Sequence, residues 1–423
     1  MTVEILAVGT ELLMGQIANT NAKYISSKLP DIGINVYFHQ VAGDNPSRLK
    51  NALLHALSRS DAVIMTGGLG PTMDDLTKDV VAGCFGKKLV IDEESLSRIR
   101  ARMERATNQA MAKNNIKQAY FPEGALILSN ENGTAPGCII EDGGKTVIML
   151  PGPPSEMQPM FDNQIMPYLA KFGGHRLESR YLRIFGIGES RLEEMLKDLI
   201  ETQSNPTIAT YAKEGEVAIR LTARHTAGLE PDDDRERTDI ITPIADIIRE
   251  RVGDCLYSAD DEELEEAAVK ALSQKNLTLA LAESCTGGLI ASRITAIPGV
   301  SSVFLASAVT YGNEAKMSAL GVRSETLSAY GAVSSETARE MAEGARRVFG
   351  SDIAVSVTGI AGPDGGNDVK PVGLVYLALA GIHGVNVREL RVSGPRARVR
   401  NIACLNAFDM IRRAALGLPI TTG

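Results

Sequence analysis

Short apolar segments alternate with longer amphipathic segments in the first part of the chain. Strands are predicted at residues 3–8, at 34–42 and from Asp61, with helices over 19–29 and 47–59 between them. Strands and helices that follow one another in this way predict a parallel sheet covered by helices on both faces. Ligands of such sheets bind at the carboxyl ends of the strands. We therefore expect a site in the loops that follow these strands.

The alternation weakens after residue 172 and resumes near residue 256. Between them lie a strand, a glycine turn and an amphipathic helix, and then an alternating strand at 217–223. This order predicts a small α+β connector without obvious chemistry. A chain of 423 residues exceeds the usual size of one hydrophobic core. We therefore predict three domains, at 1–172, 173–255 and 256–423.

Composition and charge narrow the class of protein. With 44% hydrophobic and 23% charged residues, the chain is typical of a soluble α/β protein. Its formal net charge of -8 argues against direct nucleic-acid binding as its main role. We expect neither a membrane span nor a signal peptide, because no apolar run is long enough. The five cysteines are scattered without a Cys-x-x-Cys pair, which indicates a reducing cytoplasm and no zinc site.

One stretch in the last third carries the strongest chemical signal. Leu279-Ala-Leu-Ala-Glu-Ser-Cys-Thr-Gly-Gly288 is an apolar run that ends in hydroxyl and thiol groups, and an amphipathic segment follows it. The pattern predicts a buried strand, a tight turn and a helix start. The N–H groups of such a helix start favour an anion or a developing oxyanion. The alternative is that Ser284 or Thr286 only caps the helix and the glycines permit close packing.

The residues available around this turn limit the reaction. The only histidine of the C-terminal region, His383, lies in a hairpin away from the polar loops, so a Ser-His-Asp triad cannot be built there. A lysine can act as a base when its pKa is depressed by burial, and Lys316 follows a predicted strand end close to Tyr311. A Ser284–Lys316 pair, with Tyr311 assisting proton transfer, is the simplest nucleophilic arrangement. The alternatives are an exposed Lys316, or Cys285 as the nucleophile, although a lone cysteine is more often a core residue.

Two glycine-rich segments fit phosphate groups. Thr358–Gly366 follows a strand of the C-terminal region and offers enough N–H groups to hold a phosphate. A phosphorylated substrate with a scissile amide would satisfy both this segment and the Ser284 turn. In the N-terminal region, the segment 67–70 follows a strand and contains three glycines that let the backbone approach a ligand.

Asp74 and Asp75 follow the N-terminal glycines directly. Carboxylates beside an anion indicate a shared cation, and a divalent metal bridging carboxylate and phosphate oxygens would supply it. The alternative is a tight turn with an aspartate as helix cap. Two further loops, Asn130–Gly137 and Leu150–Met157, fit the same site because each adjoins a strand and is rich in Gly and Pro.

These motifs resemble a known family over essentially the whole chain. Ala282–Gly288, Tyr311 with Lys316, and Thr358–Gly366 resemble the CinA C-terminal domain, whose activity is hydrolysis of nicotinamide mononucleotide (NMN) to nicotinate mononucleotide and ammonia. Thr66–Thr77 and the two loops at 130–137 and 150–157 resemble the CinA N-terminal domain, which is similar to molybdopterin-binding proteins. The segment between them resembles the small KH-like connector of the family. The resemblance implies a multidomain α/β protein with an α/β/α amidohydrolase domain at its C-terminus.

The resemblance also implies roles for individual residues. In the amidase, Ser284 is the nucleophile, with Lys316 and Tyr311 around it. The remaining C-terminal positions contact substrate: Glu283, Cys285, Thr286, Gly287, Gly288, Thr358, Gly359, Ile360, Ala361 and Gly362. The N-terminal positions that bind ligand are Gly67, Gly68, Gly70, Thr72, Asn132, Thr134 and Gly152. Asp74 or Asp75 holds the metal.

The resulting hypothesis is a bifunctional pyridine-nucleotide recycling enzyme. The amidase needs no cofactor, whereas the N-terminal domain binds and hydrolyses ADP-ribose with Mg, Mn or Co, aided by potassium in the family. The family also suggests a homodimer. Three rivals stay open: an amidase with a non-catalytic nucleotide-binding domain, a non-enzymatic adaptor in competence or DNA damage, and a molybdopterin-biosynthesis enzyme.

Overall fold

The computed structural model describes residues 1–107, 111–173, 175–226 and 239–420. The chain divides into two compact units, and each has its own sheets and core. One unit contains Met1–Glu178, and the other joins Ser179–Ala223 to the C-terminal part of the chain. None of the helices within these ranges is both long and apolar enough to cross a membrane.

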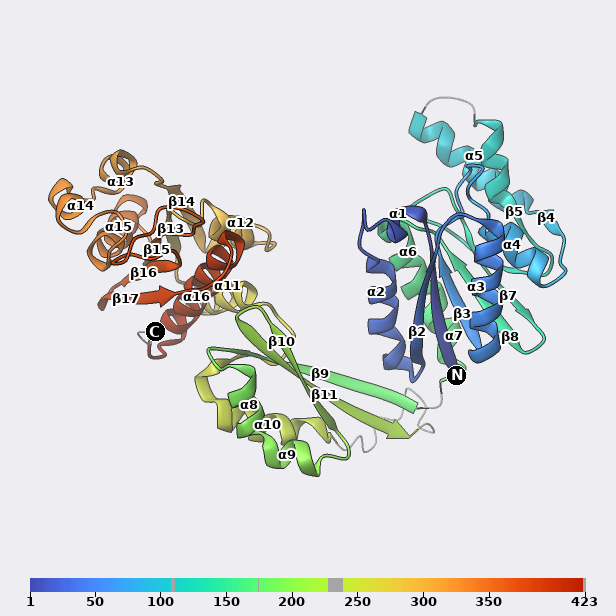
Figure 1. Ribbon diagram of the computed structural model, residues 1–423, viewed down its shortest axis with the longest axis horizontal. Coiled ribbons are helices and arrows are strands. Elements are labelled where there is room, and N and C mark those ends of the chain that lie inside the picture. The colour runs from blue at the N-terminus through green and yellow to red at the C-terminus, as the bar shows by residue number, and fades with distance from the viewer. Residues whose placement is uncertain (108–110, 174, 227–238, 421–423) are drawn as a thin grey trace. The chain divides into compact units, whose positions relative to one another are not determined.

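The first unit is built around a six-stranded mixed sheet (Figure 1). Its strands, in spatial order, are β2 (Asn35–Ala42), β1 (Thr2–Val8), β3 (Ala62–Thr66), β8 (Lys145–Leu150), β7 (Gly137–Asp142) and β6 (Leu126–Leu128). The first four are parallel, as the alternating pattern predicts, and β7 and β6 add an antiparallel edge. A small separate ribbon pairs β4 (Leu89–Ile91) with β5 (Tyr120–Pro122).

Helices cover both faces of this sheet because successive side chains of a strand point to opposite sides. Along β1, Ile5 packs into the core shared with α2 (Thr20–Lys28) and Leu6 into the core shared with α3 (Pro46–Arg59). The other helices of the unit are α1 (Thr10–Leu13), α4 (Thr77–Cys84), α5 (Glu93–Thr107), α6 (Pro154–Met160) and α7 (Met166–Ala170). The carboxyl ends of the four parallel strands lie at one edge, where the glycine-rich loops begin.

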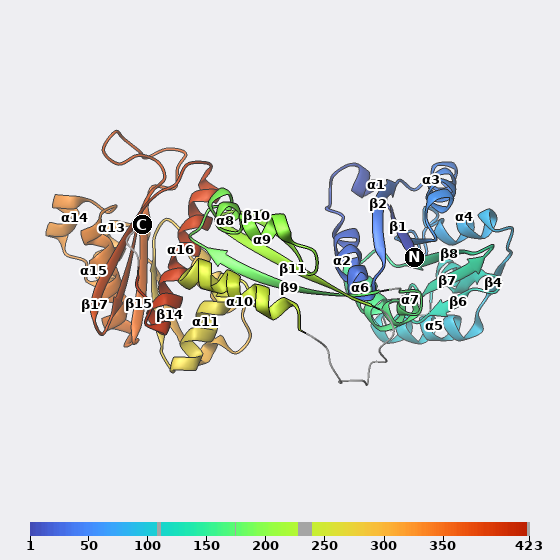
Figure 2. The same ribbon diagram turned by 90° about the horizontal axis from the view of Figure 1, so that it is seen from below.

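The connector is a four-stranded antiparallel sheet with helices on one face (Figures 1 and 2). Its strands, in spatial order, are β10 (Thr207–Lys213), β11 (Glu216–Thr226), β9 (His175–Phe185) and β12 (Leu256–Ser258). The helices are α8 (Glu189–Met195), α9 (Lys197–Thr202) and α10 (Ile241–Val252). The α+β character predicted for this segment is confirmed.

The C-terminal domain is a five-stranded sheet between two helical layers. Its strands, in spatial order, are β14 (Phe304–Val309), β13 (Leu279–Glu283), β15 (Ile353–Gly359), β16 (Leu374–Gly381) and β17 (Gly384–Arg391). The strands β14, β13 and β15 pair in parallel, and β16 pairs antiparallel with both of its neighbours, β15 and β17. The helices are α11 (Leu264–Lys275), α12 (Leu289–Thr295), α13 (Asn313–Leu320), α14 (Ser324–Tyr330), α15 (Ser335–Phe349) and α16 (Arg396–Leu416).

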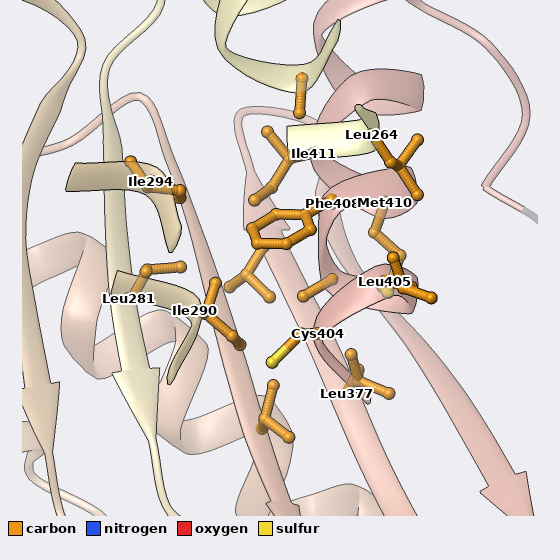
Figure 3. Close-up of a cluster of buried hydrophobic side chains, with 14 of the residues drawn as sticks. Leu264, Leu281, Ile290, Ile294, Leu377, Cys404, Leu405, Phe408, Met410 and Ile411 are labelled. Atoms are coloured by element: carbon orange, nitrogen blue, oxygen red, sulfur yellow. The ribbon is translucent and has the colours of Figure 1, made fainter. Parts of the chain in front are cut away.

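The largest hydrophobic cluster described in this domain lies between the sheet and the layer of α11, α12 and α16. Figure 3 shows Phe408 of α16 among Leu281 of β13 and Ile290 and Ile294 of α12. All four side chains are almost fully buried, and each contributes about 1.5–3 kcal/mol by burial alone. This packing fixes α12 and α16 against the strand that leads into the Ser284 turn.

Candidate active sites

The Ser284 turn is shaped by the strand before it and by two glycines after it. All five residues of β13 are buried, and the Ser284 N–H continues the ladder by donating to Val357 O at 3.0 Å. The turn closes where the Gly287 N–H donates to Ser284 O at 3.0 Å. Gly287 and Gly288 have φ angles of 61° and 88°, in the left-handed region that favours glycine. Ser284 therefore follows β13, the strand between β14 and β15, at the carboxyl edge of the sheet.

Lys316 lies beside Ser284. Its side chain is only 1% exposed, although it belongs to a surface helix, α13. The amine nitrogen Nζ is 3.1 Å from Ser284 Oγ, and it donates to the carbonyls of Thr310 at 2.7 Å and Tyr311 at 3.3 Å. The alternative of an exposed Lys316 is thus ruled out by its burial.

The surroundings of Lys316 favour the neutral amine. Burial lowers the pKa of Lys316 below its usual value. Within the described ranges, no carboxylate comes within ion-pair distance of it. In its neutral form the amine would keep two N–H groups for the two backbone carbonyls, which would leave its lone pair for the proton of the Ser284 hydroxyl. This arrangement can withdraw the hydroxyl proton of Ser284.

The hydroxyl of Tyr311 does not face Ser284, as proton transfer between the two groups would require. Its side chain is 61% exposed, and its hydroxyl accepts a hydrogen bond from Arg396 Nη2 at 3.1 Å. The Tyr311 group that contacts Lys316 is the backbone carbonyl. In this structure Tyr311 therefore orients the base through its backbone and the Arg396 guanidinium through its ring.

Glu283 is fully buried and has both carboxylate oxygens occupied. One accepts from the Ile290 N–H at 3.1 Å, and the other from the Ala291 N–H at 2.9 Å and from Ser307 Oγ at 3.3 Å. A carboxylate at the start of α12 also meets the positive end of the helix dipole. Glu283 thereby ties the first turn of α12 to the end of β13, and its role here is to hold the turn.

Cys285 is a core residue in this structure. The thiol is 5% exposed and belongs to the cluster drawn in part in Figure 3. Burial raises the pKa of Cys285 to about 11, so the thiol stays protonated at neutral pH. Ser284 is therefore the better nucleophile of the two.

Several polar groups of the turn are free to bind a ligand. In the described part of the chain, the backbone N–H groups of Thr286 and Gly288 have no recorded acceptor, and that of Cys285 has only the thiol of its own side chain. The hydroxyls of Thr286 and Thr310 are buried and also lack a partner there. Buried polar groups are nearly always hydrogen-bonded, so such a cluster indicates a place for a substrate oxygen or a water molecule.

Two arginines at the start of α16 reach the same loops, and the sequence reasoning missed them. Arg400 Nη2 donates to Thr286 O at 2.6 Å, and Arg396 Nη1 donates to Gly362 O at 2.9 Å. The sequence does indicate these arginines, because Arg396-Ala-Arg-Val-Arg400 places three cations and no acidic residue at the start of α16. Cations at the positive end of a helix are unfavourable unless an anion is nearby.

The loop after β15 adjoins the Ser284 turn because β15 pairs directly with β13. Thr358 is buried, and its hydroxyl donates to Ala332 O at 2.7 Å. Gly359 packs so closely that a Cβ there would lie 2.8 Å from Leu374 O, whose carbonyl also accepts from the Ile360 N–H at 2.9 Å. Ala361 is also buried, so the loop is held in place by its own contacts.

In the first unit, the glycines after β3 are required by packing. A Cβ on Gly67 would lie 2.3 Å from Val8 O, and one on Gly68 would lie 2.3 Å from Thr77 Oγ1. The Thr77 hydroxyl donates to Gly67 O at 2.9 Å. A Cβ on Gly70 would lie 2.6 Å from Asp75 Oδ2. The tight turn of the alternative interpretation is present, but no aspartate caps the helix that follows, because Leu76 stands at the N-cap of α4 and no side chain caps it.

Asp75 closes the loop by accepting from the Thr72 N–H at 2.8 Å and the Thr72 hydroxyl at 2.6 Å, and Asp74 is exposed. Within the described ranges, no group of three metal-ligating side chains comes together. A metal such as Mg²⁺, which keeps several waters and binds one or two carboxylates plus phosphate oxygens, is compatible with Asp75. The second oxygen of Asp75 has no recorded partner among the described residues.

Most of the N-terminal residues predicted to bind ligand line one of three separate cavities along the same edge of the sheet. A cavity of about 440 Å³ is lined by Gly68, Gly70 and Asp75. Gly152, beside Gly67, lines one of about 280 Å³. Thr134 lines an open hollow of about 920 Å³. Asn132 instead donates to Ser155 O at 3.0 Å and joins the two later loops.

Three lysines, which the sequence reasoning did not single out, line the 440 Å³ cavity beside the glycine loop: Lys78, Lys113 and Lys117. Lys78 is buried, and burial lowers its pKa to about 8. Its amine donates to Gln118 O at 2.6 Å. Lysines around a glycine-rich loop supply the positive charge that a phosphorylated ligand needs.

Comparisons with known proteins agree with this architecture. Residues 4–171 match the family described as probable molybdopterin binding domain, 179–258 match the damage-inducible protein CinA KH domain, and 261–415 match the CinA C-terminal domain. A putative competence-damage inducible protein of Acetivibrio thermocellus is 60% identical, over 99% of this chain and 100% of its own length.

A CinA-like protein of Dictyoglomus thermophilum is 53% identical over 99% of this chain and 100% of its own length. A crystal structure described as competence/damage inducible protein CihA from Agrobacterium tumefaciens is 44% identical and covers 37% of this chain and 96% of its own, with a TM-score of 0.35. The identity to full-length relatives and the three matched domains show that this chain belongs to the CinA family.

Proposed function

We propose that the C-terminal domain hydrolyses the carboxamide of NMN to nicotinate mononucleotide and ammonia. The observation that carries the proposal is the 3.1 Å approach of a fully buried lysine amine to Ser284 Oγ. A serine beside a neutral lysine is a nucleophile with its own general base. Such a pair suits attack on an amide carbonyl without a metal or cofactor.

The reaction proceeds in two stages at the same atoms. Ser284 Oγ attacks the carboxamide carbon while its proton passes to Lys316 Nζ. The oxyanion that forms is stabilised by the N–H groups of the turn, those of Cys285, Thr286 and Gly288. The C–N bond then breaks, the leaving nitrogen takes the proton from Lys316 Nζ, and ammonia departs.

Water completes the cycle by attacking the ester that joins Ser284 to the nicotinoyl group. Lys316 Nζ accepts a proton from the water and returns it to Ser284 Oγ as the C–O bond to the serine breaks. The phosphate of the substrate needs a positive surface, and Arg396 and Arg400 supply it at the rim formed by the turn and the Gly362 loop. The glycine-rich segment after Thr358 adds backbone N–H groups nearby.

For the N-terminal domain we propose binding, and metal-dependent hydrolysis, of ADP-ribose. The glycine loop, the three lysines of the 440 Å³ cavity and Asp75 support this because a pyrophosphate needs cations and close backbone approach. Asp75 would hold a divalent metal, which polarises phosphate oxygens when bound. The alternative is a binding module that retains ADP-ribose intact, and product analysis with Mg²⁺, Mn²⁺ or Co²⁺ separates the two.

A second candidate function is an adaptor in competence or DNA damage, because relatives are described as competence-damage inducible proteins. The net charge of -8 disfavours direct contact with nucleic acid. A gel shift with DNA at low salt would test whether the protein binds nucleic acid directly, as an adaptor of this kind could. We further propose that the protein acts in the cytoplasm as a homodimer, which light scattering of the purified chain would test.

The deciding experiment is ammonia release from NMN by the full chain, with and without EDTA. We expect release that is unaffected by EDTA, because the Ser284–Lys316 pair needs no metal. No release from folded protein would overturn the amidase and favour the adaptor. Release that EDTA abolishes would overturn the serine–lysine mechanism.

A further inference from the structure

A hairpin of the connector packs on the helix that carries the two arginines of the amidase site. Strands β10 and β11 pair up to Lys213 and Glu216, so only Glu214 and Gly215 form the turn. Gly215 has a φ of 84°, and a Cβ there would lie 2.7 Å from Ile402 Cδ1 of α16. The backbone of the turn therefore touches α16 directly, in the same compact unit.

Glu214 uses both carboxylate oxygens on α16. One accepts from Arg398 Nη1 at 3.1 Å, and the other accepts from Asn401 Nδ2 at 2.7 Å. These two residues lie on the same first turns of the helix as Arg396 and Arg400, which contact the Gly362 and Thr286 carbonyls. The hairpin thus holds the segment of α16 from which both arginines project.

The same contact extends to α12, the helix that follows the Ser284 turn. Asn401 Oδ1 accepts from Arg293 Nη1 at 3.1 Å. Arg293 in turn donates to both oxygens of Glu265 on α11, at 3.0 and 2.7 Å. Glu214 and Asn401 therefore connect the hairpin to α16 and α12 together, and these two helices flank the nucleophile.

Further contacts anchor the base of the hairpin, so its turn is not loosely placed. Lys213 Nζ donates to Glu263 Oε1 at 2.9 Å, and the Tyr257 hydroxyl donates to Glu216 Oε1 at 2.6 Å. Glu216 is buried. With the strands fixed at Lys213 and Glu216, the turn that carries Glu214 is held against the start of α16.

We propose that Glu214 is a positioning residue for the amidase site, acting through Asn401 and Arg398 to hold Arg396, Arg400 and the start of α12 in register with Ser284. The connector is then part of the catalytic unit rather than a spacer. This inference rests on the proposed amidase function, because it concerns the geometry of that site.

The test compares Glu214→Ala with wild type in the full chain. We expect kcat/KM for NMN to fall roughly 10-fold, because loss of positioning misplaces the reacting groups. The melting temperature should change little, since the Glu214 side chain is 41% exposed and exposed ion pairs add little stability. Glu214→Gln keeps an acceptor for Asn401 and should recover part of the loss.

A double variant separates positioning from a general effect on stability. Asn401→Ala should lower kcat/KM by a similar factor, and Glu214→Ala combined with Asn401→Ala should lower it no further, because the two residues act in one chain of contacts. The matched control is Glu201→Ala, which removes an exposed carboxylate paired with Lys197 elsewhere in the connector. Multiplicative effects of the two variants, or activity equal to the control, would overturn the proposal.

A readout without substrate distinguishes failure of this inference from failure of the proposed function. Hydrogen exchange of the α12 amides from Ile290 to Ile294 should accelerate several-fold in Glu214→Ala and not in Glu201→Ala. If wild type releases no ammonia but this acceleration occurs, the amidase fails and the positioning contact stands. Unchanged exchange together with unchanged kcat/KM would refute the positioning role.

Discussion

The two candidate sites of this CinA-family protein lie at equivalent places, the carboxyl edges of their sheets, but they differ in what has been assembled there. In the C-terminal domain, a buried amine and a hydroxyl approach to 3.1 Å, and nearby N–H and hydroxyl groups have no recorded partner in the described residues. In the N-terminal domain, the glycines are explained by close packing, and one oxygen of Asp75 is used by Thr72.

The two sites differ in which of the reacting groups the protein provides and which a ligand or metal would have to add. On the proposed mechanism, the C-terminal site already contains its nucleophile and its base, so substrate only has to be oriented. The N-terminal site offers lysines, a glycine loop and one carboxylate, so a metal and phosphate oxygens would have to complete it. We therefore expect substitutions in the first site to cost more activity than substitutions in the second.

The largest effect is expected for Ser284→Ala. Removing the nucleophile of a covalent mechanism should lower ammonia release from NMN by about 1,000-fold or more. Ser292→Ala, on an exposed surface of the following helix, is the matched control and should keep full activity. If Ser284→Ala kept more than a few per cent of the wild-type rate, the assignment of the nucleophile would be wrong.

The next effect is expected for Lys316→Met, which removes the base while keeping a long apolar side chain. General-base loss typically costs about 100- to 10,000-fold in rate. Since the neutral amine is the active form, wild-type activity should rise with pH through the lowered pKa of Lys316 and then level off. A pH profile measured on Lys316→Met should lack this rise.

Lys275→Met, at the exposed end of α11, should keep both the rate and the pH profile of wild type. If the activity of Lys316→Met still rose with pH as in wild type, the titrating group would be a residue other than Lys316. Lys316 would then not be the base that activates Ser284.

A smaller effect, confined to the other domain, is expected for Asp75→Asn. Asparagine still accepts from the Thr72 N–H, so the loop should persist, but it is a weaker ligand for a hard cation. ADP-ribose hydrolysis should fall by at least the roughly 10- to 100-fold that weakening a metal site costs, and ammonia release should stay unchanged. Asp142→Asn, at the exposed end of β7, is the control for a general charge effect, and equal losses in both variants would argue against a metal at Asp75.

Much of the C-terminal site could be predicted from the sequence because its parts are local. The apolar run to Glu283, the hydroxyl cluster and the two glycines dictate strand, turn and helix in one stretch. With no histidine near the turn, the sequence favours a lysine as the base, and Lys316 follows a strand end close to Tyr311. The burial of Lys316 and its neutral surroundings depend on how α13 packs, which the sequence pattern of an eight-residue helix does not show.

Other features could not be predicted because they join distant parts of the chain. Arg400 reaches Thr286 across 114 positions, and Glu214 reaches Asn401 across 187. Glu283 and Tyr311 were recognised as parts of motifs, but their side chains turn to the α12 backbone and to Arg396. A motif identifies which residues matter, whereas the packing of separate elements decides which atom of each residue faces the substrate.

The smallest effect concerns stability rather than activity and tests the electrostatics of the N-terminal cavity. Burial lowers the pKa of Lys78 from 10.5 to about 8, so the unfolded chain binds a proton that the folded chain releases between these values. Stability should therefore rise with pH in this window and level off below about pH 8, where the folded chain also binds the proton. Between about pH 7 and pH 9 the expected gain is about 1 kcal/mol.

Lys78→Met should remove this pH dependence, and Lys88→Met, at an exposed site of the same domain, should keep it. Because the two units can unfold separately, the measurement must report on the first unit alone. Labelling of the buried Cys138 thiol in urea, mapped by mass spectrometry and corrected for the intrinsic reactivity of a thiol at each pH, gives the free energy of opening at that site. An identical pH dependence in Lys78→Met would mean that the amine stays charged in the folded protein, and the cavity would then present a full positive charge to its ligand at neutral and alkaline pH.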